Sequence, residues 1–357
     1  MTDRNPVADS GSLPPLVSEQ LLIEALPQVV PSLPARAHGL VISPGRAQAA
    51  DRLIDEFQLA QVAAWYVDLF AATAARQSCS AAVEVLCSSD LPDRLWDMVA
   101  LPVMQRGEAE WTREMLQQSH QQLKLGGWLL ASVDNPKDQW LHGQLREMFG
   151  KVTCQRLDRG CVYWSRKTQP LKKIRDFSCQ FAFRDDEGRL IQVVTRPSVF
   201  SHRRLDPGAR QLILSAEIGP EDHVLEMGCG CGAVSLAAAC QTRGQVFAVD
   251  SNARAVMCTQ QGAELNHLDN VTCLLNADGR LELPTPVDIA LANPPYYGDD
   301  RISQHFVDTS LAALRSGGAL LVVTKQPAWY ESYFESRMED ILVFESGKYF
   351  LVCGRRP

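Results

Sequence analysis

The sequence lacks long apolar runs, paired CxxC motifs and an excess of basic charge, and each absence excludes a class of protein. No apolar run is close to the length of about 18 residues that a membrane-spanning helix needs. The 11 cysteines are scattered without zinc spacing, so we interpret them as reduced thiols that pack as small apolar side chains. The net charge of −7 argues against indiscriminate coating of nucleic acid, although it permits a locally basic groove.

The first residues also lack the basic and apolar regions of a secretion signal. Residues 1–17 are rich in Pro, Ser, Gly and Asp, a composition that predicts a mobile tail. The histidines are dispersed without metal-ligand spacing, so no metal site is expected. We therefore expect a cytoplasmic monomer that does not contact a membrane.

The second half of the chain alternates apolar runs with amphipathic segments. At 357 residues, two domains are favoured over one. The alternation predicts a doubly wound parallel sheet that ends in an antiparallel pair. Strands are expected at 223–227, 245–250, 271–275, 287–292, 319–324, 341–345 and 349–353, and helices at 233–240 and 253–265.

An internal repeat links the two halves. A strand pattern beginning at Asp97 is followed by the glycine pair at Gly126, and the same pattern recurs at Asp288 and Gly317. Both pairs of positions are separated by 191 residues. Glycine pairs between a helix and a strand are common in α/β proteins, but the equal offset favours a duplicated fold.

The first copy lacks the glycine-rich turn and the amide side chain that the second copy has. Its first turn has the single glycine Gly45, and it places Leu101-Pro102-Val103-Met104 opposite Asn293. We therefore expect two tandem Rossmann-like α/β domains, of which the N-terminal one is degenerate. The predicted divisions are a tail (1–17), a degenerate domain for RNA recognition or structural support (18–168), a connector with a two-stranded turn (169–195) and a working domain (196–357).

A glycine-rich turn follows the first predicted strand of the working domain. Glu226, Gly228 and Gly230 lie between a predicted strand and a helix, where glycines let the backbone approach a ligand closely. Asp250 ends the next strand, where a carboxylate can accept hydrogen bonds from ribose hydroxyls. This pattern alone also fits a dinucleotide site.

Two acidic residues favour S-adenosylmethionine over a dinucleotide. The charge of Glu226 suits an ammonium group and would repel a pyrophosphate. Asp278 follows the third strand in a small-residue turn, where it can accept a hydrogen bond from an adenine amino group. Asp278 as an ordinary turn residue stays open as an alternative.

Asn293-Pro294-Pro295-Tyr296 follows the fourth strand, at the sheet edge where such folds bind ligands. The oxygens of Asn293 and Pro294 can accept both hydrogens of a planar amino group, and Tyr296 can stack on a base. The tetrapeptide thus predicts N-methylation, with a rigid loop carrying a surface aromatic as the alternative.

The series Glu226, Gly228, Gly230, Asp250, Asp278 and Asn293 to Tyr296 resembles the motifs of class I methyltransferases that act on exocyclic or amide nitrogens. With the stretches at 197–201 and 205–208 and the degenerate copy, the chain resembles the ribosomal RNA guanine-N2 methyltransferase family RsmC/RlmG. The resemblance implies that Phe200 and Asp206 close the S-adenosylmethionine pocket. It also implies that Asn293 to Tyr296 hold the amino group of a guanine, either in ribosomal RNA or in a ribosomal subunit.

Two departures from the family pattern are visible. The family usually has Phe where Tyr296 stands, and residues 324–329 do not match it. A protein-glutamine or DNA-adenine N-methyltransferase, and a non-catalytic ribosome-assembly factor, stay open as alternatives. Basic residues at 166–175 and 203–210 either line an RNA path or form solvated faces.

Overall fold

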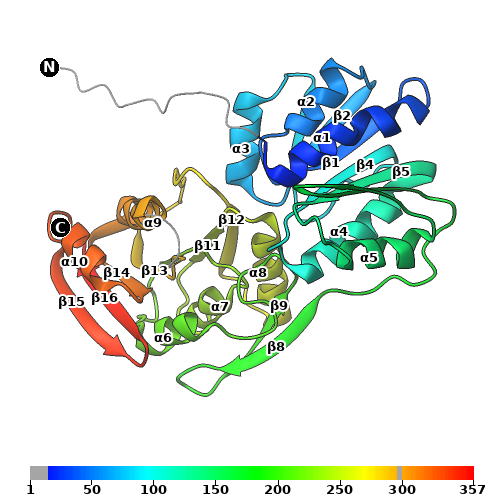
Figure 1. Ribbon diagram of the computed structural model, residues 1–357. Coiled ribbons are helices and arrows are strands. Elements are labelled where there is room, and N and C mark those ends of the chain that lie inside the picture. The colour runs from blue at the N-terminus through cyan, green and yellow to red at the C-terminus, as the bar shows by residue number, and fades with distance from the viewer. Residues whose placement is uncertain (1–14, 296–299) are drawn as a thin grey trace, which may run out of the picture.

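The chain folds into two α/β lobes joined by a β-hairpin, as the computed structural model in Figure 1 shows. The structure describes residues 15–295 and 300–357. The predicted tail lies almost entirely outside these ranges, and Val17 already begins the first helix.

The first lobe contains α1 (Val17–Val29), η1 (Val30–Ser32), β1 (His38–Ile42), α2 (Gln48–Asp55), β2 (Gln61–Tyr66), α3 (Leu69–Ser78), β3 (Val83–Cys87), β4 (Trp96–Val103), α4 (Ala109–Gln122), β5 (Leu123–Val133), α5 (Trp140–Phe149), β6 (Thr153–Leu157) and β7 (Gly160–Arg166). The hairpin consists of β8 (Cys179–Arg184) and β9 (Leu190–Thr195), within the residues predicted as a connector.

The second lobe contains α6 (Pro207–Ser215), β10 (Val224–Met227), α7 (Ala233–Ala239), β11 (Val246–Asp250), α8 (Ala253–Leu265), β12 (Val271–Leu275), β13 (Val287–Ala292), α9 (Asp300–Ala313), β14 (Leu314–Thr324), α10 (Pro327–Phe334), β15 (Glu339–Ser346) and β16 (Tyr349–Arg355). The expected strand at 319–324 begins five residues earlier, at Leu314, which pairs with Val287. The next pair joins Ala319 to Ile289, so the Gly317-Gly318 pair lies in a bulge of β14.

The two sheets have the same topology. Their strand orders are β3-β2-β1-β4-β5-β7-β6 and β12-β11-β10-β13-β14-β16-β15, so each strand of the first has an equivalent in the second. In both sheets the central strands are parallel and the last pair is antiparallel. The predicted fold class, two tandem Rossmann-like domains, is therefore confirmed.

Equivalent side chains support the duplication at the level of single hydrogen bonds. Asp97 accepts a hydrogen bond from the backbone N–H of His38 at 2.9 Å, and Asp288 accepts one from that of His223 at 2.8 Å. Each aspartate also pairs with a cation on the following strand, Lys124 in one lobe and Arg315 in the other.

The central strands of each sheet are buried on both faces, which explains their continuous apolar runs. Along β10, Leu225 and Met227 pack into one core cluster, whereas Val224 points into the cluster on the opposite face. Among the described residues, no helix is long and apolar enough to cross a membrane. All 11 cysteines are unpaired.

Candidate active site

The glycine-rich turn connects β10 to α7 and has a backbone that only glycine adopts readily. Gly228, Gly230 and Gly232 have φ values of 74°, 54° and 79°, in the left-handed region. A Cβ atom at Gly228 would lie 2.7 Å from the ring of Phe306, so this position also lacks space for a side chain. The turn therefore presents bare backbone at the carboxyl edge of the sheet.

Asp250 ends β11 and faces this turn. Its carboxylate accepts hydrogen bonds from the backbone N–H of Gly230 at 2.9 Å and from that of Asn252 at 2.8 Å. Burial raises the pKa of Asp250. Each carboxylate oxygen has two acceptor directions, so both oxygens keep the capacity to accept from ligand hydroxyls.

Glu226 lies deeper, on β10, with 4% of its surface exposed. Its carboxylate accepts hydrogen bonds from the backbone N–H (2.7 Å) and the hydroxyl of Ser235 in α7. Burial raises the pKa of Glu226 to about 8. The group is thus held by the helix that follows the glycine turn, and it favours a neighbouring positive charge.

Asn293 follows β13 and contacts Asp206. Its amide nitrogen donates to Asp206 Oδ2 at 2.9 Å, and the same oxygen accepts from the backbone N–H of Ala209 at the start of α6. A carboxylate only accepts hydrogen bonds, so it requires Asn293 to turn its NH₂ group toward Asp206. The amide oxygen of Asn293 is therefore directed away from Asp206.

Three further predicted site residues lie in different settings. Phe200 is 51% exposed and lies over the glycine turn, because a Cβ atom at Gly230 would approach the Cβ of Phe200 to 3.5 Å. Asp278 is exposed in the turn after β12 and accepts from the backbone N–H of Arg280 at 3.0 Å, which lowers its pKa. Tyr296 lies outside the described residues.

An aromatic cluster adjoins Pro295 that the sequence motifs did not identify. A small hollow is lined by Pro295, Gln326, Trp329 and Tyr330, among others. Trp329 stacks on Tyr333 with ring centroids 4.7 Å apart, and its ring meets that of Tyr330 edge-on at 4.8 Å. These residues belong to α10, within and next to the stretch that departs from the family pattern.

The first lobe contacts the loop that carries Asp250. The Ser251 hydroxyl donates to the carboxylate of Asp68 at 2.6 Å. The backbones of the two loops exchange hydrogen bonds of 2.8 Å each, from Leu69 N–H to the Ser251 carbonyl and from Ala253 N–H to the Val67 carbonyl. The first lobe is thereby attached one residue away from Asp250.

A buried ionic cluster fixes the same junction. Arg254 of α8 has a fully buried side chain that pairs with Glu114 of α4, and Arg196 pairs with both Glu114 and Asp90. Partial burial alone would raise the pKa of Asp90, but the hydrogen bonds and charge of Arg196 lower it to about 2. Arg254 also lies 4.6 Å above the ring of Trp111.

The segment between the hairpin and α6 is strained and is supported by α4. Ser198, Ser201 and Arg203 have φ values of 75°, 61° and 76°, which L side chains rarely adopt. Glu108 accepts from the backbone N–H of Ser198 at 2.8 Å, and Glu110 pairs with Arg203 at 2.8 Å. The first lobe therefore holds the segment that carries Phe200.

Some of the basic residues expected along an RNA path have other partners. Lys167 is buried and donates to the Leu123 carbonyl at 2.6 Å, so its placement on an RNA path is wrong. Arg166 lies over Trp128, and Arg203 is paired as described above. No group of three or more possible metal ligands occurs within residues 15–295 and 300–357.

The second lobe contains a known domain. Residues 190–353 match the family model of the methyltransferase small domain. This range includes both strands that carry the glycine turn and Asp250, as well as Asn293. The second lobe therefore resembles the methyltransferase small domain over this range.

Two curated relatives are similar over part of their length. Ribosomal RNA small subunit methyltransferase C of Hahella chejuensis is 30% identical over 204 residues, which cover 54% of this chain and 58% of the relative. The protein of the same name from Pseudomonas entomophila is 30% identical over 205 residues, covering 54% of this chain and 59% of the relative. The chain thus matches less than two thirds of the length of these relatives.

A solved structure shares both lobes. The 16S rRNA N2-guanine methyltransferase RsmC of T. thermophilus, in complex with AdoMet and guanosine, superposes with a TM-score of 0.79. The match covers 99% of this chain and 98% of that chain at 20% identity, which shows a common two-lobe fold. The resemblance predicted from the sequence motifs is confirmed by these matches.

Proposed function

We propose that this protein transfers a methyl group from S-adenosylmethionine to the N2 amine of a guanine in ribosomal RNA. The single observation that carries the proposal is the hydrogen bond between Asn293 and Asp206, because it turns the amide oxygen of Asn293 away from Asp206 at the end of β13, the strand that pairs with β10. The similarity to the methyltransferase C relatives favours ribosomal RNA over protein or DNA.

The residues of the second lobe fit the cofactor. The bare backbone of Gly228 and Gly230 accommodates its close approach, Asp250 can accept from the ribose hydroxyls, and buried Glu226 favours its ammonium group. We assign Asp278 to the adenine amino group and Phe200 to the outer wall of the pocket. S-adenosylmethionine supplies an electrophilic methyl group bonded to a sulfonium sulfur.

The chain itself positions the amine. The Asn293 oxygen and the Pro294 carbonyl accept the two amino hydrogens, which directs the nitrogen lone pair toward the methyl carbon. Bound S-adenosylmethionine would supply the methyl group, and the amine held by these two oxygens would release one proton to solvent on methylation. Tyr296 and the aromatic cluster of α10 provide faces on which the target base can stack.

The first lobe lacks this chemistry, so we assign it to support and RNA recognition. At the position equivalent to Asn293 it has Pro102, inside β4, which offers no amide side chain. We expect the protein to act as a cytoplasmic monomer on ribosomal RNA or a ribosomal subunit. Light scattering with and without RNA tests the monomer assignment.

Tritiated-methyl transfer followed by nucleoside analysis tests the proposal. Ribosomal RNA from a strain lacking the gene should gain label in N2-methylguanosine when the protein and labelled cofactor are added. Label in another nucleoside, or in protein only, would refute the substrate assignment. Asp250→Ala should abolish cofactor binding in calorimetry, and normal affinity in that variant would contradict the cofactor site.

A further inference from the structure

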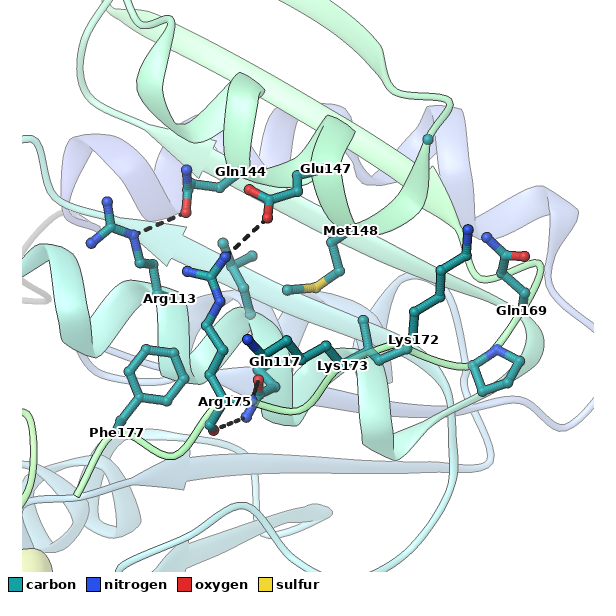
Figure 2. Close-up of a pocket in the computed structure, with 14 residues that line it drawn as sticks. Arg113, Gln117, Gln144, Glu147, Met148, Gln169, Lys172, Lys173, Arg175 and Phe177 are labelled. Carbon is teal, nitrogen blue, oxygen red and sulfur yellow. Dashed lines mark hydrogen bonds and ion pairs between the residues drawn. The ribbon is translucent and has the colours of Figure 1, made fainter.

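A groove separate from the active site lies where the connector crosses the first lobe. The connector segment 169–177 passes over α4 and α5 and encloses a cavity of about 300 Å³, which Figure 2 shows. None of its lining residues is among those assigned above to the cofactor or to the target amine.

The connector is attached to this groove by a specific side chain. Gln117 of α4 donates to the Arg175 carbonyl at 2.9 Å and accepts from the Arg175 N–H at 2.8 Å. The Arg175 guanidinium pairs with Glu147 of α5 at 3.0 Å. The cavity walls are therefore fixed by contacts from both helices, as the dashed lines in Figure 2 show.

The groove is positively charged although the whole chain carries a net charge of −7. Its lining includes Arg113, Lys172, Lys173 and Arg175, with Glu147 as the one carboxylate among the lining residues. Within the described part of the chain, Lys172 and Lys173 form no ion pair, and both are exposed. Elsewhere, basic residues such as Arg196 and Arg254 form ion pairs with carboxylates at the lobe junction.

The interior of the groove suits a nucleotide. Leu116, Met148 and Phe177 provide apolar surface, and the amides of Gln144 and Gln169 can hydrogen-bond base edges. Apolar and aromatic surface beside Lys and Arg is the combination that single-stranded RNA requires, with bases on the floor and phosphates at the rim. An acidic peptide would pair with the cations but would not need the apolar surface of Leu116, Met148 and Phe177.

Helix α4 connects the groove to the active-site segment. Glu110, near its start, pairs with Arg203 beside Phe200, whereas Gln117 holds the connector. Glu110 and Gln117 are seven positions apart along the helix, which corresponds to about 10 Å at about 1.5 Å per residue. Helix α4 thus links the segment that carries Phe200 to the connector groove.

We propose that this connector groove binds single-stranded RNA that flanks the target guanine, with Lys172 and Lys173 contacting phosphates. The proposal rests on the proposed function, because it assigns the groove to the same RNA substrate.

Fluorescence anisotropy with a short fluorescein-labelled single-stranded oligoribonucleotide tests the groove directly in the full chain. The double variant Lys172→Ala/Lys173→Ala should bind about tenfold more weakly. Its slope of log K against log salt should be smaller by about 1.4, because two single-strand phosphate contacts are lost. The matched control Arg36→Ala/Lys137→Ala removes two exposed charges outside the groove and should bind as the unaltered protein does.

Glu147→Gln provides a test that misfolding cannot mimic. Removing the one carboxylate of the lining should strengthen RNA binding several-fold, since it currently repels phosphate and pairs with Arg175. In methyl-transfer assays, the double lysine variant should raise KM for ribosomal RNA and leave kcat and cofactor affinity unchanged.

The failure of this proposal differs from failure of the proposed function. If the double lysine variant and its control bind RNA with equal affinity while methyl transfer persists, the proposed RNA-binding role of the groove is refuted and the proposed function is not. Preferential binding of labelled polyglutamate over RNA at the groove would also overturn that role, in favour of an acidic protein partner. Groove-dependent RNA binding without any methyl transfer would instead refute only the proposed function.

Discussion

Asp68 and Asn252 form an antiparallel bridge between the two lobes, and they are equivalent residues of the duplicated fold. Asp68 caps α3 by accepting from the backbone N–H of Ala71, and Asn252 caps α8 by accepting from that of Arg254. The backbone hydrogen bonds on either side of the bridge are also exchanged reciprocally. At this bridge the two lobes therefore meet through equivalent loops, as two subunits do across a twofold axis.

The contact between this bridge and Asp250 leads to a prediction about cofactor affinity. Ser251→Ala removes the hydrogen bond to Asp68 without altering the cap of α3. We expect the Kd for S-adenosylmethionine to rise two- to tenfold, about 0.5–1.5 kcal/mol, because the loop carrying Asp250 is less constrained. Calorimetry measures this change. Ser316→Ala, at an exposed serine, serves as the control, and equal affinities in both variants would contradict the coupling.

The orientation of Asn293 can be tested through its partner. Asn293→Ala should lower kcat by at least about 100-fold with cofactor affinity retained, because the amine is no longer held in line. Asp206→Asn can still cap α6 but no longer forces the amide of Asn293 into one orientation. We expect a smaller loss, about tenfold, in single-turnover methyl transfer. An Asp206→Asn variant with full activity would show that this hydrogen bond does not orient the acceptor.

The pKa of Glu226 predicts how the stability of the ligand-free protein depends on pH. Its folded-state pKa, about 8, lies above the ordinary value of 4.5, so the folded state retains a proton that the unfolded state releases. The associated stability is present below about pH 4.5 and is lost as the pH rises toward 8, by up to about 1.4 kcal/mol per pH unit.

Glu226→Gln should flatten this part of the profile, because glutamine does not titrate. Urea unfolding at several pH values measures the effect as the difference between the variant and the unaltered protein. Parallel profiles for the two proteins between pH 5 and about 8 would rule out a raised pKa at Glu226.

The ionic cluster at the lobe junction predicts a large stability difference between two glutamates of the same helix. Glu114→Ala should destabilise the protein by about 3–5 kcal/mol, because Arg254 is left fully buried without its main partner. Glu110→Ala breaks the exposed pair with Arg203 and should cost below about 1 kcal/mol. Chemical denaturation compares the two variants directly, and similar losses in both would refute the assignment.

The second lobe could be predicted in detail because its strands are local apolar runs with clear stops. The helix expected at 253–265 and the strands expected at 271–275 and 287–292 occur with those bounds. The duplication was visible because Asp97 and Asp288 perform the same backbone contact in both sheets. The assignment of individual site residues stays a prediction until ligand binding is measured.

The junction between the lobes could not be predicted from sequence. Arg254 lies in an amphipathic helix where a cation normally faces solvent, and its partner Glu114 is 140 residues away. The contact between Asn293 and Asp206 likewise spans 87 residues. Such pairs depend on how complete elements pack, and neither residue alone carries a local signal of its partner.

The reciprocal bridge at Asp68 and Asn252 has a consequence for how the protein can change. In a homodimer every substitution appears in both subunits, so losing a catalytic group on one side means losing it on both. Because one chain contains both halves here, Pro102 can occupy the position equivalent to Asn293 while Asn293 itself is retained. Covalent linkage also keeps the two halves together at any dilution, so activity per molecule should not depend on protein concentration.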